Sequence, residues 1–227
     1  VSIISFIFTA LTGVLLVKDL NQPKRFLYIV FRPQFKSWLA RGTYIIITFS
    51  LALLVLILVC ISGNESTAKL ILILISPLAV ITAVYTTFLF AQAKGRAFWD
   101  NKMSIFFMLL HAIILGSIII TFVISMNSKT ENQILNLIHV LNLIVTVWLF
   151  KGSRVLESEI VSDMILKGKY KFQFWGMVIF IGNVLPVLLL YFFQAGSIVY
   201  LASMFIIIGI IISNSLFIKV PQTIPLS

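Results

Sequence analysis

The sequence predicts an all-α protein, a polytopic bundle of transmembrane helices, and its composition is the first reason. Of the 227 residues, 60% are hydrophobic and 11% are charged, and the mean hydropathy is +1.12. A soluble domain carries about 45–50% apolar and about 25% charged residues. A chain of this size cannot hide so much apolar surface in a core of its own. Lipid must therefore solvate much of it.

The second reason is the length of the apolar runs. A helix that crosses a bilayer needs about 20 mostly apolar residues. Seven runs approach or exceed that length: residues 1–17, 44–62, 68–91, 104–126, 134–150, 172–193 and 197–217. No internal repeat, low-complexity tract or soluble domain is visible, so we expect residues 1–227 to form a single bundle.

Two of the connections between these runs are long. Residues 18–43 and 152–171 are expected to be interfacial loops. The second loop has the spacing of a short interfacial helix with an apolar stripe made of Val155, Ile160, Met164 and Ile165. The chain begins inside an apolar run without an initiator Met, which we interpret as the loss of an N-terminal part.

Basic residues are distributed unevenly between the two sides of the membrane. If successive loops alternate, all but two of the 17 Lys and Arg residues fall on the side that holds residues 18–43, which we name side one. The exceptions are Lys69 and Lys129. The positive-inside rule places side one in the cytoplasm. The net charge of +10 is then a feature of topology, and no nucleic-acid partner is expected.

Two polar residues inside the apolar runs lie at similar depths. With a rise of about 1.5 Å per residue, His111 is about 10 Å and Tyr85 about 9 Å from side one. His139 is expected near the opposite face, which argues against a haem ligated by both histidines, because two such imidazoles lie about 4 Å apart. With one cysteine, Cys60, and no dense set of His and carboxylates, no metal is expected in this chain.

Each of these residues also has a structural interpretation. A tyrosine in a span commonly bonds to a neighbouring helix carbonyl, and His139 with Asn142 would hold helices together. Trp38 and Trp99, each taken alone, would be interfacial anchors. All four tryptophans fall at side one, however, so that face is built differently from the other.

Several motifs together indicate a family. The first apolar run is followed by Asp-Leu-Asn-Gln-Pro-Lys-Arg-Phe at residues 19–26, and Ser-Trp-Leu-Ala-Arg-Gly-Thr at residues 37–43 opens the next run. Tyr-Thr-Thr-Phe-Leu at residues 85–89 precedes Lys-Gly-Arg-Ala-Phe-Trp-Asp-Asn at residues 94–101. With Phe-Trp-Gly and Gly-Asn-Val-Leu-Pro near the C-terminus, nearly the whole chain resembles the NrfD/polysulfide-reductase membrane-subunit family.

Members of that family have eight helices, react with quinones and dock an iron–sulfur protein that often serves a molybdopterin subunit. The resemblance therefore implies seven visible spans of eight, with the first helix missing. It implies menaquinone or another quinone bound as substrate, and an iron–sulfur cluster subunit and a molybdopterin catalytic subunit as partners. It also implies a prokaryotic cell (inner) membrane. Relatives dock their partner on the outer face, whereas the charge rule favours the cytoplasmic face for side one.

The resemblance also implies a site. We expect the quinone head group between the first, third and fourth apolar runs, near side one. Tyr85 would donate a hydrogen bond to one quinone carbonyl, and His111 would be a second donor or a proton relay. Asp19 would pass protons to the surface, and Arg25 would hold it ionised.

Partner docking is expected on the aromatic and basic loops of side one. The residues expected there are Trp38, Arg41, Arg96, Phe98 and Trp99. Two other classes of function stay open: a transporter or ion-translocating bundle, and a purely structural membrane anchor. An inverted repeat or a pair of helices broken at the midplane would favour a transporter, and the sequence shows neither. Saturable binding of a quinol analogue would separate the first reading from both alternatives.

Overall fold

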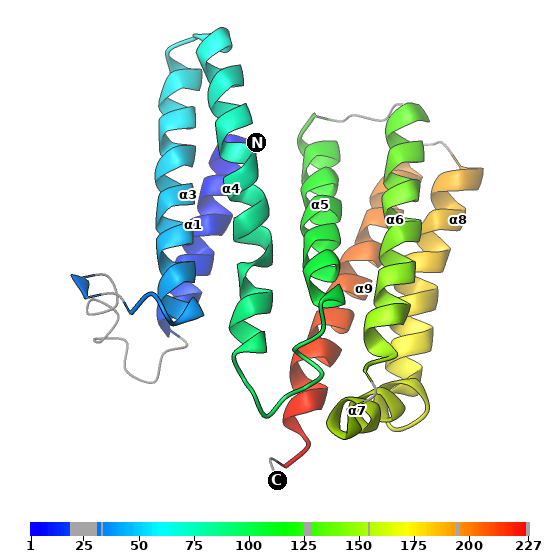
Figure 1. The fold of residues 1–227 in the computed structure, drawn as a ribbon. Helices are drawn as coiled ribbons and strands as arrows, with labels where there is room; N and C mark the ends of the chain where they lie inside the picture. The colour runs from blue at the N-terminus through cyan, green and yellow to red at the C-terminus, as the bar shows by residue number, and fades with distance from the viewer. Residues whose placement is uncertain (19–30, 33, 125–128, 154, 194–195, 226–227) are drawn as a thin grey trace. The chain divides into compact units, whose positions relative to one another are not determined.

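A computed structural model of the protein describes residues 1–18, 31–32, 34–124, 129–153, 155–193 and 196–225. Every regular element in these residues is helical (Figure 1), which confirms the predicted all-α class. Within these residues, six helices are long and apolar enough to cross a membrane, and a seventh apolar helix is slightly shorter. Each of the seven predicted apolar runs is therefore helical in the described residues.

The helices are named as in Figure 1. In chain order they are α1 Ser2–Lys18, α3 Trp38–Ile61, α4 Glu65–Ala91, α5 Met103–Ile124, α6 Lys129–Phe150, α7 Leu156–Leu166, the π-helix η2 Gln173–Val184, α8 Leu185–Phe192 and α9 Gly196–Gln222. Internal contacts group the chain into two compact units, unit 1 (Val1–Leu89) and unit 2 (Phe90–Ser227). Each unit has apolar clusters of its own, and the single bundle indicated by the sequence stays a prediction.

Unit 1 is organised around α3. Leu53 and Leu56 of α3 form a buried cluster with Ile75 of α4, and Phe6 of α1 packs against it. The helix begins at Trp38 and not at residue 44 as predicted, after Ser37 in an extended conformation. Aromatic and basic side chains can stay at the interface while their backbone is already helical, so apolarity alone misplaces such a helix start.

Prolines inside two helices leave backbone carbonyls without their usual donor. Pro77 of α4 has no N–H for the carbonyl of Ile73, and the hydroxyl of Ser76 donates to that carbonyl at 2.8 Å. Pro221 of α9 frees the carbonyl of Phe217 in the same way. Lipid offers no donor for such a carbonyl, so a protein side chain must supply one.

The apolar run at residues 172–193 is not one regular α-helix. It consists of η2 followed by α8, with Pro186 in the first turn of α8. At the end of η2 the N–H of Leu185 donates to the carbonyl of Phe180, five residues earlier. Asn183, also in η2, is buried, and its amide donates to the carbonyl of Val178 at 2.8 Å. Segments of π-helix are rare and frequently occur at functional sites.

The α7 helix lies at the side-one end of unit 2 (Figure 1). The predicted interfacial helix is present, but its buried face is different, since Val155 and Ile160 are exposed and Val161 is buried. The reason is the preceding turn, where Gly152 has φ +74° and lies close to the hydroxyls of two serines of α7. Small side chains let this turn approach α7, so they occupy the inward face beside Val161 and Ile165.

Two glycines set the distance between η2 and α9. A Cβ built on Gly182 would lie 2.5 Å from the Cα of Gly209. Small residues allow the backbones of membrane helices to approach closely. The most extensive helix contact in unit 2 therefore depends on the absence of two side chains.

We expect Gly182→Ala to lower the stability of the protein, because the added methyl group meets backbone that cannot rotate away. Such overpacking costs about 1–3 kcal/mol. Gly116→Ala is the matched control: nothing lies within 4 Å of its Cβ, and Ala is the better helix former by about 1 kcal/mol. Thermal unfolding of the purified chain in nanodiscs should give a lower midpoint for the first variant and an equal or higher one for the second. Equal midpoints for wild type and Gly182→Ala would contradict the close contact.

Candidate functional site

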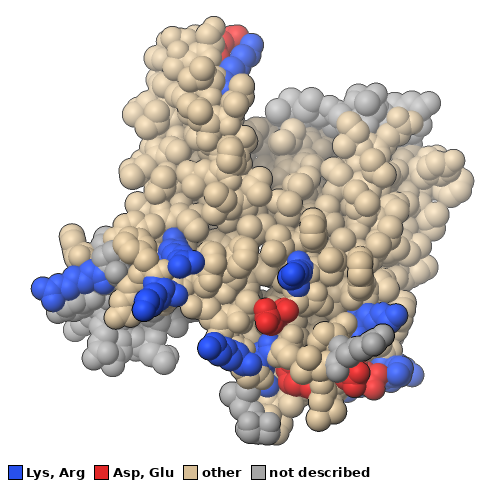
Figure 2. All heavy atoms as spheres, in the orientation of Figure 1, with Lys and Arg blue, Asp and Glu red and all other residues tan. Residues whose placement is uncertain are grey.

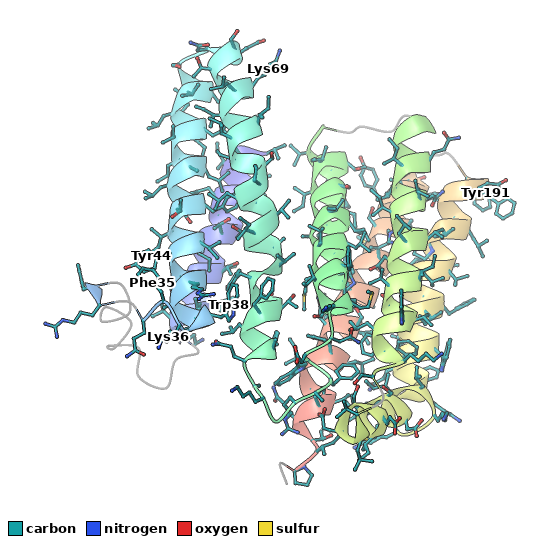
Figure 3. All side chains as sticks on the ribbon, in the orientation of Figure 1. Phe35, Lys36, Trp38, Tyr44, Lys69 and Tyr191 are labelled. Atoms are coloured by element: carbon teal, nitrogen blue, oxygen red, sulfur yellow. The ribbon has the colours of Figure 1, made fainter. Side chains whose placement is uncertain are left out.

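The two motifs of unit 1 meet where α3 begins and α4 ends. The Trp38 ring stacks on Phe88 of α4, with centroids 4.5 Å apart and planes inclined by 15°. The guanidinium carbon of Arg41 lies 4.7 Å from the centroid of the Trp38 ring. Figure 3 shows Trp38 at the first turn of α3. Arg41 is exposed, so this corner offers a positive charge held in place by aromatic rings.

Tyr85 lies against the same part of α3. Its side chain is 4% exposed. A Cβ built on Gly42 would lie 2.5 Å from the Tyr85 ring, so the ring occupies the space that any other residue at position 42 would fill. No hydrogen bond joins the Tyr85 hydroxyl to any residue in the described part of the chain. The ring of Tyr85 is thus held in place, while its hydroxyl donates to none of the described residues.

An apolar groove of about 710 Å³ runs between α1 and α3. Residues along it include Phe6, Gly13 and Ile46, and its side-one end is marked by Lys18 and Thr43. Thr43 follows directly after the glycine that contacts Tyr85. The groove is therefore lined mainly by hydrocarbon and ends near the polar corner of unit 1.

In unit 2, the loop between α4 and α5 is tied to other elements. The Arg96 guanidinium donates to the carbonyl of Ile224 at 2.6 Å, and the Phe98 N–H donates to the Glu157 carboxylate at 2.9 Å. The Trp99 indole N–H donates at 2.8 Å to the carbonyl of Phe217. This is the carbonyl freed by a proline four residues later in α9.

Burial changes the interpretation of two residues in this loop. Phe98 is 0% and Trp99 is 7% exposed, and both belong to the large apolar cluster of unit 2. Their rings are therefore part of the core and not of a docking surface, which corrects the expectation from the sequence. Arg41 and the half-buried Trp38 of unit 1 remain accessible. Arg96 is half-buried and bonded to backbone.

His111 lies inside unit 2. Its Nδ1 is 3.3 Å from Oδ1 of Asn214 on α9, and its ring centroid is 4.1 Å from that of Phe107. Tyr85 belongs to unit 1, so the expected pairing of Tyr85 with His111 stays a prediction. Asp19 and Arg25 lie outside the described residues.

The helix α6 begins at Lys129, so His139 lies near the middle of the helix. The apolar span within α6 begins at Gln133, one residue from the predicted start. Counted from the side-one helix ends, His139 lies about 16 Å and His111 about 12 Å deep. The difference in depth between the two histidines is therefore too small to argue against a haem that both of them ligate. Among the described residues, no three His, Cys, Asp or Glu side chains are grouped so that they could hold a metal ion.

Three asparagine side chains also form hydrogen bonds inside unit 2. Asn142 of α6 donates to Asn183 of η2 at 3.0 Å, and both side chains are buried. Asn214 is the partner of His111. The signal was present in the sequence as single Asn residues within apolar runs, where polar groups are rare and face the bundle interior.

The surface around α7 carries both signs of charge (Figure 2). Lys167 donates to Asp163 at 2.9 Å, and this hydrogen bond raises the pKa of the lysine. The corner of unit 1 where α3 begins is basic in the same figure. A partner that docks on unit 2 would therefore meet a mixed surface, and one that docks on unit 1 a positive surface.

The family described as polysulfide reductase (NrfD_2) matches residues 1–224. No curated protein matches the chain. No solved structure matches it either.

The bond between Trp99 and the freed carbonyl yields a prediction about stability. We expect Trp99→Phe to lower the unfolding midpoint, because the buried carbonyl of Phe217 loses its donor at a cost of about 1–3 kcal/mol. Pro221→Ala should rescue this variant, since alanine returns the missing backbone N–H. Trp148→Phe, which removes an indole that is 58% exposed, is the matched control and should change little. Failure of the rescue would show that the indole acts by packing alone.

Proposed function

We propose that this chain, which belongs to the polysulfide reductase family (NrfD_2), exchanges electrons between the membrane quinone pool and a docked iron–sulfur subunit. Membership makes the chain a membrane subunit of an oxidoreductase complex. The quinone, menaquinone or a relative of it, is the substrate of this subunit. The electrons pass to or from the partner, which in turn serves a molybdopterin catalytic subunit.

The observation that carries the proposal is the unused hydroxyl of Tyr85. A quinone presents two carbonyl oxygens, each of which accepts a hydrogen bond, and a tyrosine hydroxyl is a neutral donor. Gly42 leaves room for the ring, so the hydroxyl is held in one place before the ligand arrives. A donor that is positioned in advance costs less entropy when the ligand binds.

The groove between α1 and α3 supports the same ligand class. A quinone carries a long apolar tail, and ligand sites for such molecules are mostly apolar with few polar groups. The groove volume of about 710 Å³ lies within the range of roughly 300–1,000 Å³ found for small-molecule sites. Its side-one end at Lys18 and Thr43 is where a head group would leave the hydrocarbon.

Reduction of a quinone takes up two electrons and two protons. In the proposal, His111 is a second donor or a relay for these protons, Asp19 passes them to the surface at side one, and Arg25 keeps Asp19 ionised. Arg41 and Trp38 contribute to the surface that receives the iron–sulfur subunit. The basic loops support a cytoplasmic position for that surface in a prokaryotic cell membrane.

Tyr85→Phe tests the proposal directly, because it removes the hydroxyl and keeps the ring. One hydrogen bond to the head group contributes about 0.5–1.5 kcal/mol, so affinity for a quinol analogue should fall roughly three- to tenfold. Tyr191→Phe is the matched control, as Tyr191 lies in α8 and is 71% exposed. Titration of the purified chain in nanodiscs measures both. Saturable binding with unchanged affinity in Tyr85→Phe would place the head group elsewhere, and no saturable binding at all would favour a structural anchor.

Gly42→Ala tests the position of the ring and not its hydroxyl. The added methyl group would lie 2.5 Å from the ring, so Tyr85 must move. We expect weaker quinol binding although the donor is still present, and no further loss when Tyr85→Phe is added. Gly116→Ala, at an open position in unit 2, should leave the affinity unchanged. Additive losses in the double variant would show that Gly42 acts independently of Tyr85.

A further inference from the structure

The inward face of α6 carries three polar side chains, each about one helical turn from the next. His139, Asn142 and Thr146 are spaced by three and four residues, so they lie on one face of the helix. All three are buried, and His139 is 0% exposed. They form a polar layer about 10 Å long in the middle of a membrane-spanning unit.

Most of the polar atoms in this layer lack a partner. Within the described residues, neither ring nitrogen of His139 has a hydrogen bond, nor does Oδ1 of Asn142 or Oγ1 of Thr146. The same holds for Oδ1 of Asn136, one turn towards side two. The Asn142 amide group is already used by Asn183. A buried polar group without a partner destabilises a protein, so these atoms favour a bound ligand in the layer.

The chemistry of these atoms points to a small neutral molecule that both donates and accepts. Asn142 and Asn136 offer acceptors, Thr146 offers a hydroxyl, and a neutral imidazole offers one donor and one acceptor. Water has this character, and buried waters in proteins typically make about three hydrogen bonds to otherwise unsatisfied groups. No charged group is needed to hold it.

The layer is closed more tightly towards side one than towards side two. Beyond Thr146, the next inward residues of α6 are Leu149 and Phe150, both fully buried in the large apolar cluster. In the other direction, Leu135 is buried in a smaller cluster, but Asn136 is only half-buried and continues the row of unpaired polar atoms. The polar row therefore leads from the middle of unit 2 towards side two.

Few titratable groups surround this layer. The α5 helix contributes His111, which lies within electrostatic range of His139. The segments η2 and α8 carry no charged residue. At the side-one end, α7 carries Glu157, whose Oε1 is buried without a partner while Oε2 accepts from backbone. His139 is thus the titratable group at the centre of the row.

We propose that His139 is a proton-binding site linked to side two by bound water on Asn136, Asn142 and Thr146. A proton that arrives along this water is taken up by the unprotonated ring nitrogen, and the imidazolium returns it to water from the same nitrogen. No electron transfer is involved. The site goes beyond the proposed quinone function and uses different residues.

The full chain allows a direct test, because it contains only two histidines. Solid-state NMR of the chain with ¹⁵N-labelled histidine in quinone-free lipid bilayers resolves two rings, assigned with His111→Gln. We expect the His139 nitrogens to show contacts to water protons, to exchange with D₂O, and to convert to the doubly protonated form as the pH is lowered. The absence of quinone separates this result from that of the Tyr85 experiment.

Three variants extend the test. Thr146→Val keeps the shape and removes the hydroxyl, so the water signal at His139 should weaken. Asn136→Leu should slow exchange with D₂O several-fold, because it blocks the side-two end of the row. Ser203→Ala is the control, as this buried hydroxyl donates to its own helix carbonyl, and it should change neither signal.

Each outcome decides the matter. Water contacts at His139 together with exchange and protonation support the proposal. A dry His139 overturns it, and so does a hydrated ring whose protonation never changes over the pH range in which the protein stays folded. Exchange that is unaffected by Asn136→Leu would overturn the assigned direction.

Discussion

The structure depends on one constraint: the hydrocarbon of a membrane cannot hydrogen-bond to a backbone or side-chain polar group. In the helices, the backbone N–H and C=O groups bond to each other. Each proline inside a helix lacks an N–H and so leaves one carbonyl without its usual donor. In α4, the hydroxyl of Ser76 donates to the carbonyl that Pro77 leaves without a donor. In α9, the freed carbonyl accepts from the indole of Trp99, which lies in the loop between α4 and α5. The same loop also bonds to α7, so three elements are joined at one end of unit 2. In the described part of the chain, the polar layer of α6 contains buried polar atoms to which no protein atom forms a hydrogen bond.

Much of the fold could be predicted because the signal is carried by composition and length. Each apolar run is helical in the described residues, since about 20 apolar residues have few alternatives to helix in lipid. Helix ends were less predictable. Apolarity set the start of α3 six residues too late and that of α6 five residues too late, because interfacial helix turns are polar.

The candidate site was predictable in part, and the reasons differ by residue. The aromatic pairing of Trp38 with Phe88 and the contact of Gly42 with Tyr85 join two motifs that the sequence marked separately. Phe98 and Trp99 had the composition of a docking surface, yet they are core residues. Composition does not show which way a ring points. The partner of Trp99 is a carbonyl, and carbonyls are the same at every position of a sequence.

The shared space of Gly42 and Tyr85 has a consequence for how the family diverges. Two positions more than forty residues apart in the sequence divide one fixed volume between them. A larger residue at position 42 is tolerated only where position 85 has already become smaller, so the order of substitutions matters. In an alignment of homologues, an aromatic ring at position 85 should therefore occur together with glycine at position 42. Larger residues at position 42 should occur only in lineages that have already lost the ring.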